Sequence, residues 1–169
     1  MQRTEIEDLG EFGLIRRLTE GTVLRQPSTL MGIGDDAAVI NPEGKRVVVS
    51  TDMLCEGVHF DLAYVPLKHL GYKSIAVNLS DICAMNAIPS QVTVSIAVSS
   101  RFSVEALEEL YAGVHKACAV YGVDLVGGDT SSSTSGLMVT VTALGLVDGE
   151  AAVARSGAKA GDLLVVSAI

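Results

Sequence analysis

The sequence predicts one domain that mixes helices and strands, and three observations support this prediction. The 169 residues suffice for a single hydrophobic core, and 49% of them are hydrophobic whereas 19% are charged. Segments with apolar residues at helical spacing alternate along the chain with shorter segments of strand-like alternation. Neither an internal repeat nor a linker-like stretch interrupts this order, so we expect one folded unit.

The first third of the chain predicts a helix followed by a hairpin. The helix at residues 5–19 has apolar residues at steps of three, and Gly21 ends it. These apolar residues are Leu9, Phe12, Ile15 and Leu18. A loop that contains Pro, Ser and Thr follows over 22–31. Residues 37–40 and 45–53 are strand-like, and the Asn-Pro-Glu-Gly turn between them predicts that they form a β-hairpin.

The middle of the chain predicts two helices on either side of a strand. The first helix, at 67–86, carries an apolar stripe and a second, polar stripe at the same spacing. The polar stripe consists of Ser74, Asn78 and Asp81. Residues 91–99 alternate like a strand with one buried face. Ser103 then caps a second amphipathic helix, which Gly122 ends.

The last third predicts strands. A short strand at 123–130 runs into a glycine turn, a polar loop occupies 131–136, and a strand follows at 137–147. Residues 161–169 also read as a strand, with neither a cap nor a polar tail after it. We therefore expect the chain to be an N-terminal domain taken from a longer protein.

Charge and cysteine content disfavour several classes of protein. The net charge of −8 argues against a nucleic-acid binder, although bridging metal ions would still allow phosphate binding. The three cysteines, Cys55, Cys83 and Cys118, match no zinc pattern and are expected as small core residues in a reducing cell. There is no signal-peptide layout at the N-terminus and no apolar run long enough to cross a membrane, so we expect a cytoplasmic protein without a membrane partner.

Several aspartates lie where apolar chain meets a turn or inside a helix, which is unusual for a charged residue. They are Asp35, Asp36, Asp52, Asp81 and Asp129. Their neighbours are often Gly, Ser or Thr, which predicts that the ends of separate elements converge on one site, with Asp81 partly buried in its helix. Carboxylates and hydroxyls without a His/Cys set favour Mg²⁺ or Ca²⁺ over zinc. Turn and cap roles for the individual aspartates remain the alternative.

The segment VGGDTSSSTSG (126–136) lets backbone N–H groups approach an anion closely. The chain contains neither GxxxxGK[ST] nor GxGxxG, which excludes a Walker A loop and a dinucleotide fingerprint. A flexible hairpin would have the same composition, so the segment alone does not decide between the two interpretations.

Five motifs together resemble the thiamine-monophosphate kinase family. They are GIGDDAAV, STDMLCEGVHF, AVNLSDICAMNAIP, VGGDT and RSGAKAGDLLVVS. They occur in the order that the family has and span nearly the whole chain. The family shares a superfamily with aminoimidazole ribonucleotide synthetase and selenophosphate synthetase. The resemblance implies an enzyme that transfers the γ-phosphoryl group of its co-substrate ATP in line onto thiamine monophosphate, giving thiamine diphosphate.

The resemblance also implies roles for individual residues. Several Mg²⁺ ions would be held by Asp36, Ser50, Thr51, Asp52, Asp81 and Asp129. ATP would contact Gly128, Asp129, Arg155 and Tyr111, and His59 would lie at the substrate. No general base is evident, and the acceptor phosphate, which is already ionised, would not need one.

The family's N-terminal half has an α+β fold with a mixed β-sheet and helices packed on one face. Two such halves pair as a homodimer whose sheets close into a barrel, with ATP near the interface. By resemblance, residues 1–169 are this N-terminal ATP- and Mg²⁺-binding dimerisation domain without the C-terminal domain, and we expect the chain alone to be inactive. The alternatives are a sibling ATP-dependent synthetase of the superfamily, and a non-catalytic module that binds Mg²⁺ and nucleotide and dimerises.

Overall fold

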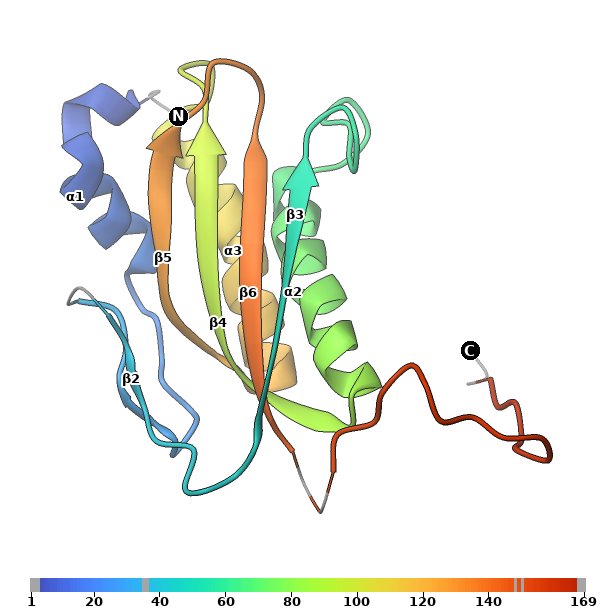
Figure 1. Ribbon diagram of the computed structural model, residues 1–169. Helices are drawn as coiled ribbons and strands as arrows, with labels where there is room; N and C mark the ends of the chain where they lie inside the picture. The colour runs from blue at the N-terminus through green and yellow to red at the C-terminus, as the bar shows by residue number, and fades with distance from the viewer. Residues whose placement is uncertain (1–3, 35–36, 148, 150, 167–169) are drawn as a thin grey trace.

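The structure, a computed structural model, describes residues 4–34, 37–147, 149 and 151–166. A four-stranded sheet carries two long helices on one face, and a third helix lies beside one edge (Figure 1). The helices are α1 (Ile6–Thr19), α2 (Leu67–Ala84) and α3 (Val104–Tyr121). The strands are β1 (Thr29–Met31), β2 (Val39–Ile40), β3 (Val47–Cys55), β4 (Ala87–Val98), β5 (Asp124–Ser132) and β6 (Met138–Val147). This mixed arrangement confirms the predicted α+β class.

The strand order in the large sheet is β3-β6-β4-β5. β6 pairs antiparallel with both β3 and β4, whereas β4 and β5 are parallel. A parallel pair needs a crossover connection, and α3 supplies it between β4 and β5. The two edge strands are therefore β3 and β5, which lie at opposite sides of the sheet.

The predicted hairpin of residues 37–40 with 45–53 is wrong. The turn between them forms, since the Lys45 amide donates to the Pro42 carbonyl at 3.0 Å. The strands nevertheless separate: β2 pairs with β1, which lies within the predicted 22–31 loop, and β3 pairs with β6. The pairing with β6 is continuous from Val47 to Cys55, a longer ladder than the two-residue β2 offers, and this tertiary pairing outweighs the local turn signal.

The core lies between the sheet and the helix pair α2–α3, where alternate residues of β4 and β6 are buried. Two glycines let the helices touch. A Cβ on Gly71 would lie 1.9 Å from the Leu110 carbonyl oxygen, and a Cβ on Gly113 would lie 1.9 Å from that of Lys68.

Of the three cysteines, Cys118 is buried, Cys55 is half-buried and Cys83 is exposed, so the expectation of three core cysteines is wrong for Cys83.

Helix α1 is kinked at Gly10, whose φ is 64°, and it is fastened to α3 at both ends. At its start, the Thr4 amide donates to the Glu105 carboxylate at 3.0 Å, and the Val104 amide donates to the Thr4 carbonyl. Near its end, Arg17 forms an ion pair with Glu108 at 2.6 Å. These contacts hold α1 beside the β5 edge of the sheet.

The segment after β6 leaves the body of the domain (Figure 1). The strand predicted over 161–169 does not form in its described part, residues 161–166, where Leu164 is 97% exposed. A strand needs a partner for its backbone groups, and no other strand pairs with this segment in the part of the chain that the structure describes. The predicted polar loop at 131–136 is also shorter than expected, because β5 continues to Ser132.

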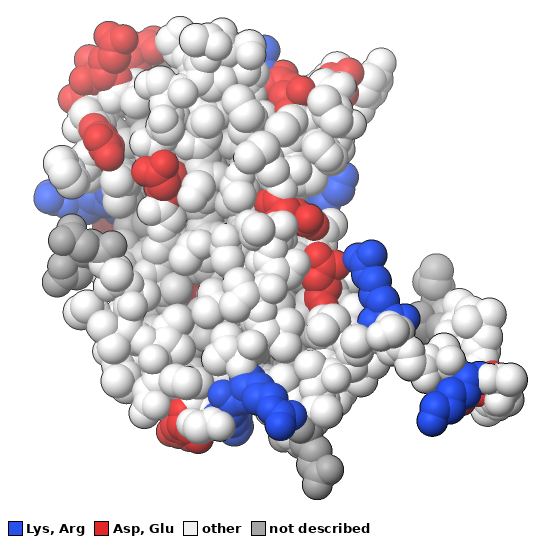
Figure 2. Space-filling model, viewed as in Figure 1, with Lys and Arg blue, Asp and Glu red and all other residues white. Residues whose placement is uncertain are grey.

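The second face of the sheet carries no helix, and its middle is mostly uncharged (Figures 1 and 2). Val47, Val49 and Met53 of β3 are exposed there, and Leu144 and Leu146 of β6 are half-buried. An apolar surface of this kind is unusual for a free sheet face.

Among the residues that the structure describes, no helix has the length and apolar character needed to cross a membrane.

Candidate functional site

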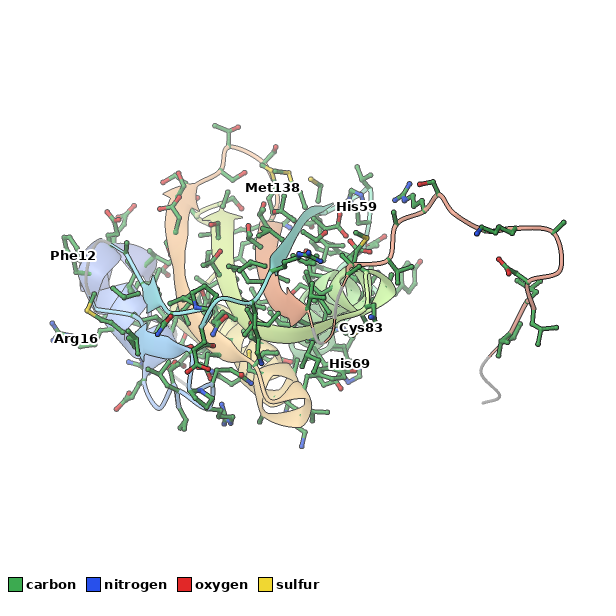
Figure 3. All side chains as sticks on the ribbon, turned by 60° about the horizontal axis from the view of Figure 1, so that its bottom comes forward. Phe12, Arg16, His59, His69, Cys83 and Met138 are labelled. Carbon is green, nitrogen blue, oxygen red and sulfur yellow. The ribbon has the colours of Figure 1, made fainter. Side chains whose placement is uncertain are left out.

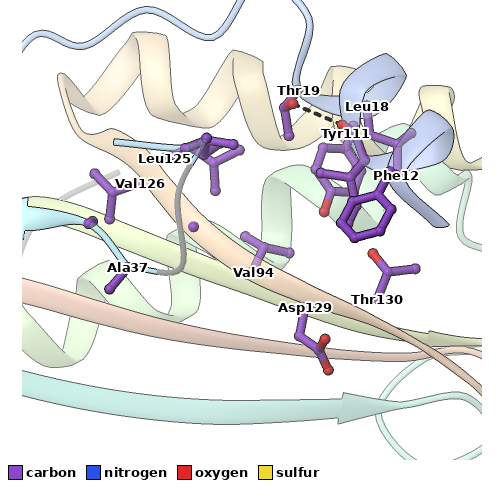
Figure 4. A pocket seen from close by; sticks show the side chains of 16 residues that line it. Phe12, Leu18, Thr19, Ala37, Val94, Tyr111, Leu125, Val126, Asp129 and Thr130 are labelled. Carbon is purple, nitrogen blue, oxygen red and sulfur yellow. Dashed lines mark hydrogen bonds between the residues drawn. The ribbon is translucent and has the colours of Figure 1, made fainter. Parts of the chain in front are cut away.

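A cavity of about 430 Å³ opens at the β5 edge, and three parts of the chain enclose it (Figure 4). Gly127, Gly128 and Asp129 of β5 form one wall. Ile33, Gly34, Ala37 and Ala38, from the connection between β1 and β2, form a second wall. The helices contribute Phe12, Ile15, Leu18, Thr19 and Tyr111. The cavity thus has an apolar side and a side made of backbone and a carboxylate.

The backbone wall depends on Gly128. A Cβ at this position would lie 1.9 Å from the Val94 carbonyl oxygen of the neighbouring strand, so only glycine fits there without a shift. Gly127 is less restricted, because its Cβ would meet only the Thr93 Cγ2 atom at 3.7 Å. As an edge strand, β5 presents backbone groups on its outer side to which a ligand can hydrogen-bond. Asp129 is exposed directly after the glycines.

Tyr111 belongs to the apolar wall and is 6% exposed. Burial raises the pKa of its phenol to about 12, so the side chain stays neutral at physiological pH. Phe12 is a lining residue that the sequence reasoning missed. The step-of-three pattern placed it in the helix core stripe, but 82% of it is exposed at the cavity mouth. No feature of the sequence alone distinguishes it from its buried neighbours in α1.

A second group of polar residues lies at the opposite edge, where α2 packs against β3. The Ser50 hydroxyl donates to the Asp81 carboxylate at 3.0 Å. The Asp52 amide donates to the Asn78 side-chain oxygen at 2.9 Å, and the Asn78 amide group donates to the Ser74 carbonyl. Asp52 and Asp81 are both exposed, so the expected partial burial of Asp81 is wrong. The polar stripe of α2 instead fixes β3 through the buried Asn78.

Thr51 does not belong to this group. Side chains alternate along a strand, so Thr51 faces the side opposite to Ser50 and Asp52. Its hydroxyl donates to the Val141 carbonyl at 3.0 Å and accepts from Thr142 at 3.1 Å. Thr51 therefore lies on the helix-free face.

The two edges do not meet within one chain. Three strand spacings, or about 14 Å, separate β3 from β5. Within the described ranges, no three His, Cys, Asp or Glu side chains lie close enough together to hold a metal ion. The predicted convergence of Asp52, Asp81 and Asp129 on one site is therefore not found in these residues. Asp35 and Asp36 lie outside the described residues.

His59 and Arg155 lie apart from the cavity. In Figure 3, His59 is on the side of the molecule away from Phe12. Its Nδ1 accepts from the Cys55 amide at 3.0 Å, so a neutral ring carries its proton on Nε2, and Lys73 donates to its carbonyl at 3.3 Å. Arg155 is exposed in the segment after β6 and forms no ion pair with any described residue.

Fold and sequence together define the class of protein. The family model for the N-terminal domain of AIR synthase related proteins matches residues 34–147, and the chain belongs to this family. Thiamine-monophosphate kinase of Bacillus subtilis (strain 168) is 40% identical over 160 residues, which are 94% of this chain and 49% of that protein. The chain spans about half the length of the curated relatives it matches.

Solved structures of such kinases have the same fold. Thiamine-monophosphate kinase from Stenotrophomonas maltophilia K279a superposes with a TM-score of 0.71 at 34% identity, over 88% of this chain and 45% of that one. The structure named AaThiL complexed with AMPPCP and TMP gives a TM-score of 0.64 at 34% identity, over 94% and 48%. The resemblance inferred from the five motifs is thereby confirmed.

Proposed function

We propose that the chain is the nucleotide-binding half of an enzyme that transfers the γ-phosphoryl group of ATP to thiamine monophosphate. The observation that carries this proposal is the cavity at the β5 edge. It combines an apolar wall with the glycine and aspartate wall at Gly128 and Asp129, in a chain related to kinases of that name. The apolar wall suits a nucleobase, and the backbone wall suits phosphate oxygens.

Magnesium ions suit the donors at the α2–β3 edge, which are all oxygens: the exposed Asp81 carboxylate accepts from the Ser50 hydroxyl, and the exposed Asp52 follows on the same face of β3. Ser50, Asp52 and Asp81 would hold ions at this edge. The family resemblance adds Asp36, Thr51 and Asp129, of which Thr51 lies on the helix-free face and Asp129 at the opposite edge of the sheet. Bound Mg²⁺ would neutralise charge on the phosphates.

Two residues would act on the anionic substrates. The exposed His59 ring, which carries its proton on Nε2, can donate that proton in a hydrogen bond to an oxygen of the acceptor phosphate. The Arg155 guanidinium supplies a fixed positive charge for the phosphates of ATP. No residue is assigned as a general base, since the attacking phosphate oxygen is already ionised.

The proposed assembly is a homodimer in the cytoplasm. The helix-free sheet face, with Val47, Val49 and Met53 exposed, supports a contact with a second copy that would close the two sheets into a barrel. Light scattering at micromolar concentration should give twice the chain mass of 17.6 kDa. A mass of one chain would contradict the dimer.

A second candidate is nucleotide binding without turnover. The chain spans about half the length of the kinases that it matches, and among its described residues no three His, Cys, Asp or Glu side chains lie close enough together to hold a metal ion. We expect this chain, assayed by itself, to bind ATP with Mg²⁺ but not to convert thiamine monophosphate.

Calorimetry with AMPPCP, an ATP analogue, and Mg²⁺ tests binding, and a product assay with ATP and thiamine monophosphate tests turnover. Asp129→Asn is the matched control, since it removes one charge from the cavity wall with little change in shape. The proposal predicts Mg²⁺-dependent heat for the parent chain, a weaker response for Asp129→Asn, and no product. Absence of heat from the parent would contradict nucleotide binding. Product formation would contradict the claim that this half is inactive by itself.

A further inference from the structure

One wall of the cavity belongs to a part of the chain outside the main sheet. β1 and β2 form a two-stranded sheet of their own, and the connection between them lines the cavity through Ile33, Gly34, Ala37 and Ala38. The opposite wall is β5 of the main sheet. The width of the cavity therefore depends on how the β1 segment is fastened to the body of the domain.

Asp124, the first residue of β5, makes the first attachment. Its side chain is fully buried, and its two carboxylate oxygens accept from consecutive backbone amides, Arg25 at 2.5 Å and Gln26 at 3.0 Å. The Gln26 side chain donates in turn to the Gly122 carbonyl at 2.6 Å. Asp124 and Asp129 are five residues apart in β5. The strand that carries Asp129 therefore also holds the chain just before β1.

Gln91 of β4 makes the second attachment. It is fully buried, and its Nε2 donates to both the Ser28 hydroxyl at 2.8 Å and the Thr29 hydroxyl at 2.9 Å. Its Oε1 accepts from the Ser90 hydroxyl at 2.7 Å, which fixes the orientation of the amide. Gln91 is the register partner of Asp124, so both attachments lie side by side on adjacent strands.

We infer that Gln91 and Asp124 are positioning residues for nucleotide binding, because they hold the wall formed by Ile33, Gly34, Ala37 and Ala38 at a fixed separation from the β5 wall. The inference rests on the proposed function of the same cavity. Burying a polar side chain costs free energy unless it is hydrogen-bonded. The Asp124 oxygens and the Gln91 nitrogen bond to residues 25–29, and the Gln91 oxygen accepts from Ser90, which fixes the orientation of the amide. A pair needed only for the stability of the main sheet would not require partners in residues 25–29, at and just before β1.

The test replaces Gln91 by Met, which keeps a side chain of similar length without hydrogen bonds. Val92→Ala is the control, because Val92 is the next residue of β4, equally buried, and has no role in the attachment. A second route, Ser28→Ala with Thr29→Val, removes the same hydrogen bonds from the other side should Gln91→Met fail to fold. Two quantities are measured in each folded variant: the Kd for AMPPCP with Mg²⁺, and amide hydrogen exchange at Thr29 and Asn41, whose amides donate to the Gln26 and Ser28 carbonyls just before β1.

Loss of the attachment should accelerate exchange at Thr29 and Asn41 and weaken AMPPCP binding at least tenfold, whereas Val92→Ala should leave the Kd within threefold of the parent. Unchanged exchange in Gln91→Met would overturn the attachment, and faster exchange with an unchanged Kd would overturn its role in binding. A parent chain that binds no AMPPCP would overturn the proposed function and with it the role in binding, and the exchange rates would then test the attachment by themselves.

Discussion

The two edges of the main sheet differ in what they offer a ligand. At the β5 edge, backbone, apolar side chains and the buried Tyr111 enclose a cavity of about 430 Å³, with Asp129 as its one lining carboxylate among the described residues. At the edge formed by β3 and α2, the exposed Asp81 carboxylate accepts from the Ser50 hydroxyl, and the exposed Asp52 lies on the same face of β3 as Ser50. Under the proposed function, the first edge would recognise the shape of the nucleobase and the second would bind metal ions.

This difference explains why the aspartates that were predicted to converge on one site lie at two edges of the sheet. Nucleobase recognition needs a cavity that excludes water, whereas hard cations need oxygen donors with room for water and phosphate. About 14 Å separates the edges in one chain, so a nucleotide with its metal ions that uses both must extend along the sheet or involve a second copy.

The largest effect is expected from Gly128→Ala. The new Cβ would lie 1.9 Å from the Val94 carbonyl oxygen, so β5 must move away from β4 and the backbone wall of the cavity is distorted. We expect a loss of about 1–3 kcal/mol in the free energy of unfolding, measured by chemical denaturation, together with loss of AMPPCP binding.

Gly127→Ala is the control for this prediction, because its Cβ would make only an ordinary contact at 3.7 Å. It should change stability by less than about 0.5 kcal/mol. Equal destabilisation by the two substitutions would show that the close approach of β5 to β4 at Gly128 is not what shapes this edge.

The second prediction compares the edges directly through Asp129→Asn and Asp81→Asn. Both side chains are exposed, so each substitution should leave the free energy of unfolding within about 0.5 kcal/mol of the parent. Each should weaken Mg²⁺-dependent AMPPCP binding at least about tenfold, or 1.4 kcal/mol. In the double variant the losses should add to within about 0.5 kcal/mol, because about 14 Å separates the two edges and the side chains share no hydrogen bond.

Calorimetric titration of the parent, both single variants and the double variant completes this cycle. Should Asp81→Asn bind AMPPCP as tightly as the parent while Asp129→Asn does not, the α2–β3 edge has no part in nucleotide binding. The two edges would then serve different ligands.

The third prediction concerns pH and the wall that α1 contributes. Hydrogen bonds from the Thr4 side chain, from the backbone amide of Glu105 itself and from the Thr4 amide lower the pKa of Glu105 from 4.5 to about 2. Because the folded-state pKa lies below the ordinary one, this carboxylate contributes stability above pH 4.5 that is lost as the pH falls towards 2. The start of α1 should detach in that window, which amide exchange at Thr4 or Val104 would report.

Glu105→Gln is the control, since it has no titratable carboxyl group. It should remove the pH dependence of the protection factor, which is the intrinsic exchange rate at each pH divided by the observed rate, between pH 4.5 and 2. The same pH dependence of the protection factor in the variant would assign the transition to another group.

The smallest effect is expected from Phe12→Ala. The side chain is 82% exposed, so its loss should change the free energy of unfolding by less than about 0.5 kcal/mol. It lines the cavity beside Tyr111, so AMPPCP binding should weaken by a few-fold, which is about 1 kcal/mol or less. Val120→Ala, at an exposed apolar residue of α3 outside the cavity lining, should leave the Kd unchanged.

Local signals predicted the helices well. Ser103 accepts from the Ala106 amide at the start of α3, and Gly122 adopts the left-handed conformation at its end, as the capping pattern predicted. The hairpin prediction failed because β3 pairs with β6, a strand about 90 residues later in the sequence. A turn signal between neighbouring segments carries no information about such a distant partner.

The candidate site was predictable in its residue types more than in its arrangement. The family resemblance selected Gly128, Asp129 and Tyr111, which do line one cavity, and Ser50 and Asp81, which do share a hydrogen bond. That these two groups lie at opposite edges depends on the strand order, which is a property of the whole sheet. Gln91 and Asp124 were not predicted, because the sequence does not distinguish a buried polar residue in a strand from an exposed polar residue at the end of a strand.

Amide NMR spectra of the chain with and without AMPPCP and Mg²⁺ test most directly whether the cavity at the β5 edge binds the nucleotide. We expect the largest chemical-shift changes at Gly127, Gly128 and Asp129 and at Gly34 across the cavity, with smaller ones at Asp52 and Asp81. Shifts confined to the α2–β3 edge, or none at saturating AMPPCP, would contradict it.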